Sequence, residues 1–130
     1  MIETSKGVIN AEKCIITTPA YVGAEILQKN WPTISDELRK VYYPPLCCVH
    51  SVYKRDKVKH KLDGFGGLNP LVENQFASGS IWSSSIFPNR CAQDEVLITT
   101  FVGGTTSVEK TKLEDKEILH RVHEELSKVY

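Results

Sequence analysis

The chain has 130 residues, of which 16 are Lys or Arg and 16 are Asp or Glu, so its formal net charge is zero. This balance provides no long-range field that would attract nucleic acid or an anionic membrane, and we expect no nucleic-acid partner. The length is sufficient for a hydrophobic core, and neither a signal peptide nor an apolar run of about 18 residues is present.

The first residues predict a hairpin followed by a buried strand. Residues 2–9 read as two short strands around the turn Ser5-Lys6-Gly7. The run 13–18 is apolar and β-branched, which predicts a buried strand that ends at Pro19.

Two short helices and a domain boundary are predicted next. Residues 20–29 predict a helix, and Trp31-Pro32 interrupts the pattern because proline disfavours helical geometry in the residue before it. We place the domain boundary here, between residues 1–32 and 33–130. Ser35 is a good N-cap for a second helix that continues to about Val41.

The middle of the chain predicts an antiparallel meander. Residues 46–53 read as a strand that places Leu46, Cys48, His50 and Val52 on one face. Further strands are predicted at 66–68, 80–87 and 95–102, with turn-rich segments between them.

The chain ends in a predicted amphipathic helix. Thr111 and Glu114 fit a capping box at its start. Its apolar stripe consists of Ile118, Val122, Leu126 and Val129. Together these elements predict an α+β fold, in which helices cover a mainly antiparallel or mixed sheet.

Three local patterns have a catalytic or ligand-binding interpretation and a simpler one. His120 and His123 have a spacing that can bind a metal, but nothing nearby completes the site and a solvated helix face is favoured. Gly64 to Gly67 resembles the start of a dinucleotide loop, yet Pro70 follows where a helix should begin. We favour a glycine-rich strand that a backbone or a flat ligand approaches. Ser83 to Ser85 lacks a glycine elbow and fits the polar face of a strand, so no catalytic or metal-binding residue is assigned.

The four cysteines, Cys14, Cys47, Cys48 and Cys91, are interpreted as small buried hydrophobic residues rather than as disulfide partners. A reducing, cytoplasmic location is therefore expected, with peripheral membrane association as an alternative.

Three motifs in order resemble the flavin-dependent protoporphyrinogen oxidases of the flavin amine oxidase superfamily. They are Gly64-Phe65-Gly66-Gly67-Leu68-Asn69-Pro70, Ser83-Ser84 with Ile86-Phe87-Pro88-Asn89-Arg90, and Thr99-Thr100-Phe101-Val102-Gly103-Gly104. Residues 14–20 are similar to the strand in which that superfamily returns to its FAD-binding domain, and Tyr43-Pro44-Pro45 resembles its entry into the substrate sheet.

The resemblance implies that residues 1–32 belong to the FAD-binding domain of a longer parent and 33–130 to its substrate-binding domain. It implies oxidation of protoporphyrinogen or coproporphyrinogen to the porphyrin, with FAD and oxygen, in heme biosynthesis. Leu68, Ile81 and Phe101 match the ring-sandwiching positions of the family. Phe101 is expected to stack on a pyrrole ring while Leu68 and Ile81 clamp the macrocycle from the other side, and each has an alternative role as a core residue.

The chain departs from the family pattern because it lacks the glycine fingerprint for the FAD pyrophosphate. The isolated chain is therefore expected to bind no FAD and to be inactive. Its expected partners are the porphyrinogen, the remainder of the parent enzyme and further copies of itself. The alternatives are a self-standing module that binds a tetrapyrrole or another flat ligand without turnover, and another flavin amine oxidase-like enzyme.

Overall fold

The computed structural model describes residues 1–130, which form two compact units, Met1–Tyr43 and Pro44–Tyr130. The division into compact units lies after Tyr43, and the helices on either side of Trp31-Pro32 pack against each other. We describe the two units separately.

The first unit begins with the predicted hairpin. Strands β1 (Ile2–Thr4) and β2 (Gly7–Ile9) are antiparallel, and Thr4 pairs with Gly7. The prediction of a strand at 13–18 is wrong, because no other segment of the chain lies beside it to form a ladder.

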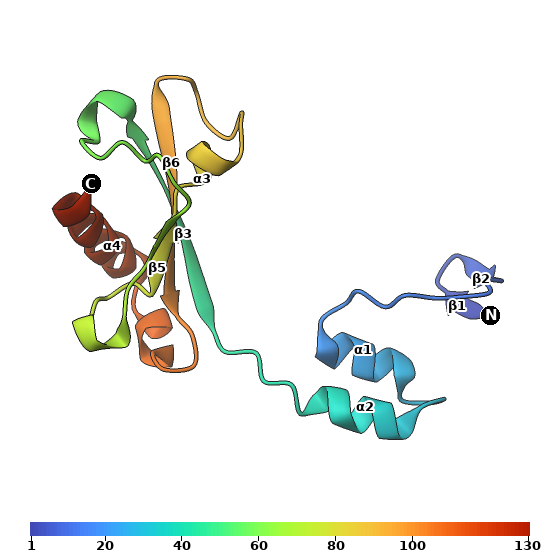
Figure 1. Cartoon of the computed structure of the whole chain (residues 1–130). Coiled ribbons are helices and arrows are strands. Elements are labelled where there is room, and N and C mark those ends of the chain that lie inside the picture. Colours follow the sequence, from blue (N-terminus) through green and yellow to red (C-terminus); the bar gives the residue numbers. More distant parts are fainter. The chain divides into compact units, whose positions relative to one another are not determined.

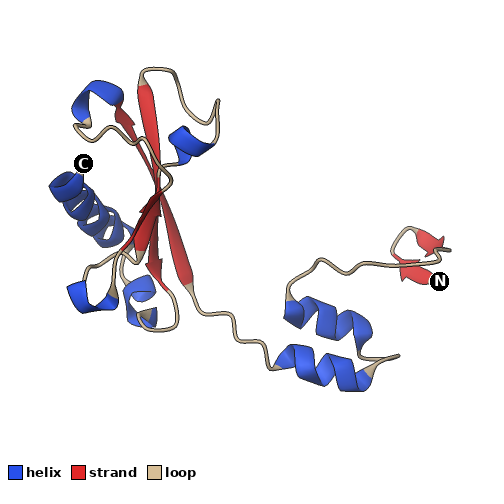
Figure 2. Cartoon of the chain, in the orientation of Figure 1, coloured by secondary structure: helices blue, strands red, loops and turns tan.

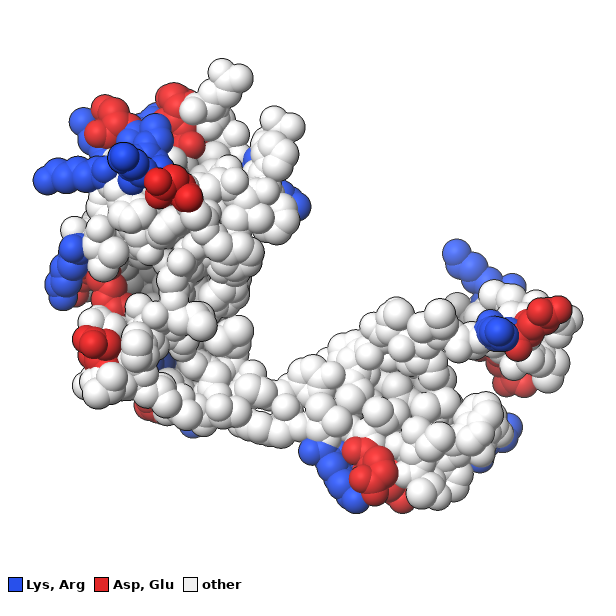
Figure 3. All heavy atoms as spheres, in the orientation of Figure 1, with Lys and Arg blue, Asp and Glu red and all other residues white.

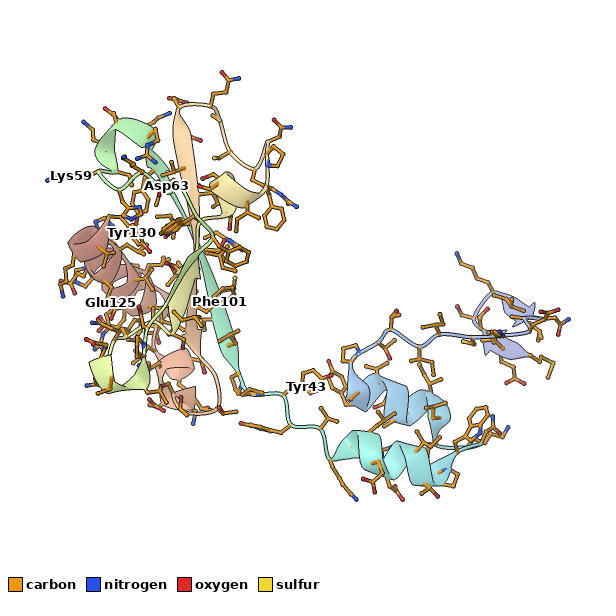
Figure 4. The ribbon with its side chains drawn as sticks, viewed as in Figure 1. Tyr43, Lys59, Asp63, Phe101, Glu125 and Tyr130 are labelled. Carbon is orange, nitrogen blue, oxygen red and sulfur yellow. The ribbon has the colours of Figure 1, made fainter.

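Two short helices complete this unit, α1 (Ala20–Leu27) and α2 (Pro32–Arg39). Helix α2 begins at Pro32, a position where the missing N–H of proline costs no helical hydrogen bond. The prediction of Ser35 as an N-cap is therefore wrong. Ser35 is 1% exposed, and its hydroxyl donates to the Ala24 carbonyl of α1 at 2.8 Å. Tyr43, labelled in Figure 4, accepts the N–H of Ala20 at 2.9 Å.

The second unit is built on a four-stranded sheet (Figures 1 and 2). Its strands are β3 (Leu46–Lys54), β4 (Gly66–Leu68), β5 (Gly79–Ile81) and β6 (Glu95–Gly103), in the order β3-β6-β5-β4. Every pairing is antiparallel, so β4, β5 and β6 form the predicted meander and β3 lies on the far side of β6. The α+β class is confirmed.

One face of this sheet is covered by α4 (Asp115–Val129). The core between them consists of Val49, Ala77, Ile98, Val102, Ile118, Val122 and Leu126. The predicted apolar stripe of α4 is thus confirmed at Ile118, Val122 and Leu126, whereas Val129 is exposed. The capping box is wrong: Glu114 occupies the N-cap without a side-chain hydrogen bond, and Thr111 belongs to a preceding 3-10 helix, Val108–Lys112.

Helix α3 (Ser83–Ile86) lies on the other side of the sheet from α4 (Figure 1). The prediction of a strand over 80–87 is therefore wrong beyond Ile81. The serine hydroxyls explain the difference, because they attach this turn of helix to its neighbours: Ser83 Oγ lies 2.7 Å from Thr99 Oγ1, Ser84 Oγ accepts the Leu97 N–H, and Ser85 donates to the Leu62 carbonyl.

The connections contain two further 3-10 helices, Arg55–Lys57 and Leu71–Glu73. None of the helices combines the length and the apolar character that crossing a membrane would require. All four cysteines are free, and the buried interpretation is wrong for Cys14 and Cys48, which are exposed. Cys47 and Cys48 do alternate in burial along β3, as adjacent strand residues should.

Candidate functional site

The register of the sheet brings the three predicted site residues to one face. Leu68 pairs with Gly79, and Gly79 pairs with Phe101, so these three residues form one row across β4, β5 and β6. Ile81 is in the neighbouring row of the same face, paired with Thr99. Side chains of paired residues in an antiparallel sheet point to the same side, and this side is the one opposite α4. Figure 4 labels Phe101 on the sheet and Glu125 on α4.

Gly79 lies between Leu68 and Phe101 in this row. Neighbouring strands are about 4.8 Å apart, so the backbones that carry these two side chains are separated by about 10 Å. Gly79 has φ +155, and a Cβ there would lie 2.5 Å from the Gly67 carbonyl oxygen and 3.1 Å from the Leu68 side chain, so only glycine fits this position. We call the surface formed by Leu68, Gly79 and Phe101 the slot.

The slot is accessible and apolar. Leu68 is 87% exposed, and Ile81 and Phe101 are half-buried. In Figure 3 the charged side chains of this unit gather mainly over its α4 side, and the opposite side carries few of them. A flat apolar ligand could therefore enter without displacing hydrated charges.

A fixed imidazole lies beside the slot. His50 Nδ1 is 3.0 Å from Thr99 Oγ1, and Thr99 is held in turn by Ser83. His50 Nε2 is 3.7 Å from Cys48 Sγ, and Cys48 pairs with Phe101 across the strands. Alternation along the strand predicted that His50 and Cys48 share a face, but it could not tell whether this face of the sheet is the one opposite α4. It also gave no sign of the slot at Gly79, because both depend on strand register.

Ion pairs lie away from this slot. Lys54 Nζ is 2.8 Å from Asp94 and 3.0 Å from Glu95, at the end of the β3–β6 ladder. Hydrogen bonding to Asp94 and Glu95 raises the pKa of Lys54, and the hydrogen bond from Lys54 lowers the pKa of Asp94. These exposed groups join the ends of two strands and do not face the candidate site.

The two histidines of α4 point to different partners. His120 Nε2 is 3.5 Å from Glu124, whereas His123 Nδ1 is 3.1 Å from the Tyr53 hydroxyl. No group of three or more His, Cys, Asp or Glu side chains converges on one point in the structure.

The glycines of the chain do not fit the phosphates of FAD. A dinucleotide cradle needs glycines that open a helix, and none of the eight glycines precedes the first residue of an α-helix. Gly66, Gly79 and Gly103 instead lie against the backbone of a neighbouring segment. We therefore derive no step through a flavin bound to this chain.

The family model for flavin containing amine oxidoreductase matches residues 2–130. The chain belongs to this family of oxidoreductases, which implies FAD in the parent enzyme.

Within the family, the chain is similar to plant protoporphyrinogen oxidases, as its motifs indicated. It is 32% identical to "Protoporphyrinogen oxidase, chloroplastic" of Oryza sativa subsp. japonica over 98% of this chain and 25% of that protein. It is 34% identical to "Protoporphyrinogen oxidase, mitochondrial" of Nicotiana tabacum over 81% of this chain and 21% of that protein. The chain spans about a quarter of the length of these relatives.

Proposed function

We propose that this chain is the substrate-binding part of an FAD-dependent enzyme that oxidises protoporphyrinogen or coproporphyrinogen to the porphyrin in heme biosynthesis. One observation carries the proposal: Leu68 and Phe101 flank Gly79 on the sheet face that α4 leaves uncovered. This arrangement suits a flat macrocycle, and relatives named protoporphyrinogen oxidase support the choice of ligand.

The role of these residues is to bind and orient the macrocycle. Phe101 stacks on a pyrrole ring, and Leu68 and Ile81 contact its opposite side. FAD, when bound to the parent enzyme, supplies the redox chemistry, so the chain itself needs no acid, base or nucleophile at the slot. Correct orientation of the reacting carbon is the contribution expected of such a wall.

The proposal includes the division into domains. The first part of the chain belongs with the FAD-binding domain and the second with the substrate-binding domain. The sequence predicted the boundary between residues 32 and 33, and the packing of α2 on α1 favours a boundary after Tyr43. In isolation the chain is inactive and binds no flavin. The cytoplasm is its proposed location.

Exposed apolar side chains support the proposal that the isolated chain binds the remainder of the parent enzyme and otherwise associates with itself. They include Ile15, Leu68 and Val72. In water such surface tends to be covered.

The test is a titration of the 130-residue chain with protoporphyrin and with coproporphyrin, followed by porphyrin fluorescence. Phe101→Ala and Leu68→Ala should each weaken binding about 5-fold to 30-fold, on the scale of 1 to 2 kcal/mol for a lost apolar contact. Leu68 is too exposed for its truncation to disturb folding. Circular dichroism checks the fold of both variants.

Val72→Ala is the matched control, because Val72 is equally exposed but lies on the 3-10 helix Leu71–Glu73. Equal affinity of all four proteins for both porphyrins would contradict the proposed site. Absence of porphyrin binding to the unchanged chain would favour another flavin amine oxidase-like substrate.

The second candidate is a binding module that holds a tetrapyrrole without turnover. The observation that favours it is the row of Leu68, Gly79 and Phe101 itself, which can contact a flat ligand without a flavin. Sequencing the surrounding gene distinguishes the two, because only the enzyme requires a dinucleotide fingerprint elsewhere in the same reading frame.

A further inference from the structure

A second cavity lies on the other face of the sheet, between α4 and the strands β4 and β5. Its volume is about 330 Å³, and its lining includes Gly67, Ser80, Thr100, Val122 and Tyr130. Gly79 lines this cavity with its backbone, whereas the side chains of Leu68, Ile81 and Phe101 point away from α4, so the cavity and the proposed porphyrin slot share no side chain.

The cavity exists because the side chains in one row of paired residues become smaller toward the β4 edge of the sheet. Val49, Thr100, Ser80 and Gly67 are paired in that order across the four strands and face α4. At the β4 end the row has no side chain, and a Cβ on Gly67 would have no atom within 4 Å. Gly67 is not among the glycines with positive φ, so its backbone does not require glycine. The open space is the structural consequence of this residue.

Thr100 lies beneath the cavity with an unsatisfied hydroxyl. It is 1% exposed, and its Oγ1 has no hydrogen-bond partner and almost no accessible surface. A buried hydroxyl without a partner is costly, but this one is closed off from the cavity and is not a ligand contact.

A second hydrogen is free beside it. The Trp82 indole N–H donates to the Tyr130 hydroxyl at 3.0 Å, and the hydroxyls of Tyr130 and Ser80 are 2.9 Å apart. These three groups carry three hydrogens and form two bonds, so one hydroxyl hydrogen is uncommitted whichever group donates. Ser80 and Tyr130 both line the cavity, so this hydrogen favours a ligand with an acceptor oxygen.

The remaining walls define the rest of the ligand. Val122, Leu126 and Trp82 supply apolar and aromatic surface. Lys128 also lines the cavity and makes no ion pair. Glu125 is committed, because its two carboxylate oxygens accept the backbone N–H groups of Phe76 and Ala77.

We propose that this cavity binds a small flat molecule whose oxygen accepts a hydrogen bond from the Ser80–Tyr130 pair, an aromatic carboxylate or carboxamide. The aromatic ring would lie over Gly67 against Leu126 and Trp82. A volume of about 330 Å³ is at the lower end of ligand pockets and suits a single ring. The charge of Lys128 favours the carboxylate form and the charge of Glu125 opposes it, so the two forms need separate measurements.

Benzoate and benzamide are the probes, titrated into the ¹⁵N-labelled 130-residue chain and followed by two-dimensional NMR. Saturable shifts at Gly67, Thr100 and Val122 are expected, with a dissociation constant on the order of 1 mM or below for at least one probe. Gly67→Val should abolish binding by filling the space, and the double variant Ser80→Ala/Tyr130→Phe should weaken it about 10-fold through loss of both hydroxyls. Gly67→Ala is the milder filling variant if valine disturbs β4.

Phe101→Ala is the matched control, since Phe101 faces the opposite side of the sheet and its loss should leave the affinity for both probes unchanged. Shifts that fail to saturate for either probe, or that persist unchanged in both Gly67 variants, would overturn the proposal and leave the cavity to water. Because the porphyrin titration uses different residues, either proposal can fail without the other.

Discussion

At the scale of single residues, adjacent threonines of β6 have opposite hydrogen-bonding states. The Thr100 hydroxyl has no partner, whereas the Thr99 hydroxyl lies within hydrogen-bond distance of both His50 and Ser83. Both side chains are buried and valine has nearly the same shape. The pair therefore separates the effect of a satisfied hydroxyl from that of an unsatisfied one at the same depth in one strand.

We predict that Thr100→Val raises the free energy of unfolding of the chain by about 1 kcal/mol, because it removes an uncompensated polar group. Thr99→Val should lower it by about 1 to 2 kcal/mol, because it leaves the partners of the hydroxyl unpaired. Urea unfolding followed by fluorescence measures both. A loss of stability in Thr100→Val would show that its hydroxyl has a partner in solution, and an unchanged Thr99→Val would contradict the polar contacts at α3.

At the scale of elements, the helix pair of the first unit depends on one buried hydroxyl. Ser35→Ala removes the 2.8 Å hydrogen bond to the Ala24 carbonyl, at a position where water cannot replace it. We predict a loss of about 1 to 2 kcal/mol of local stability, seen as a 5-fold to 30-fold fall in hydrogen-exchange protection of the Ala20–Leu27 amides. Thr33→Ala, on the exposed side of α2, is the control and should change protection little. Equal exchange in both variants would contradict this role of Ser35.

The elements that the sequence predicted well are those whose pattern repeats over many residues. Strands β3 and β6 are nine-residue runs rich in apolar and β-branched residues, and helix α4 repeats its apolar positions at helical spacing over 15 residues, so composition and spacing identify them. The segment 13–18 has strand-like composition but no partner, and composition alone does not supply a ladder. The segment 83–86 became helical because its three hydroxyls bond to distant residues, which no local pattern reveals.

The candidate site shows the same limit. The resemblance to a family identified Leu68, Ile81 and Phe101, but only the register shows that they share a face with Gly79 between Leu68 and Phe101. The free hydroxyl of Thr100 and the open space at Gly67 also arise from the pairing of distant strands. Contacts between residues far apart in sequence decide all of these features.

At the scale of the whole molecule, the two units differ in how much they bury. Both hydrophobic clusters consist entirely of residues from the second unit, including Val49, Val58, Val96 and Ile98. In the first unit, Ala24 is the one buried hydrophobic side chain. The cost of ordering a chain is met chiefly by apolar burial, so the second unit contains nearly all of the interactions that can stabilise a fold.

We therefore predict that residues 44–130 fold alone, with a melting temperature within a few degrees of that of the whole chain, and that residues 1–43 alone are only marginally stable. The first unit has two helices of eight residues each and one short hairpin, and elements of this length are marginal in water without a core. Calorimetry of the three polypeptides, with amide dispersion in NMR spectra, measures the outcome. The prediction would be contradicted if residues 44–130 alone did not form the sheet β3-β6-β5-β4. Loss of the cross-strand contacts of Thr100 with Val49 and Ser80 would show this. A cooperative transition in residues 1–43 would instead show that Ser35 and the α1–α2 contact suffice for a small independent domain.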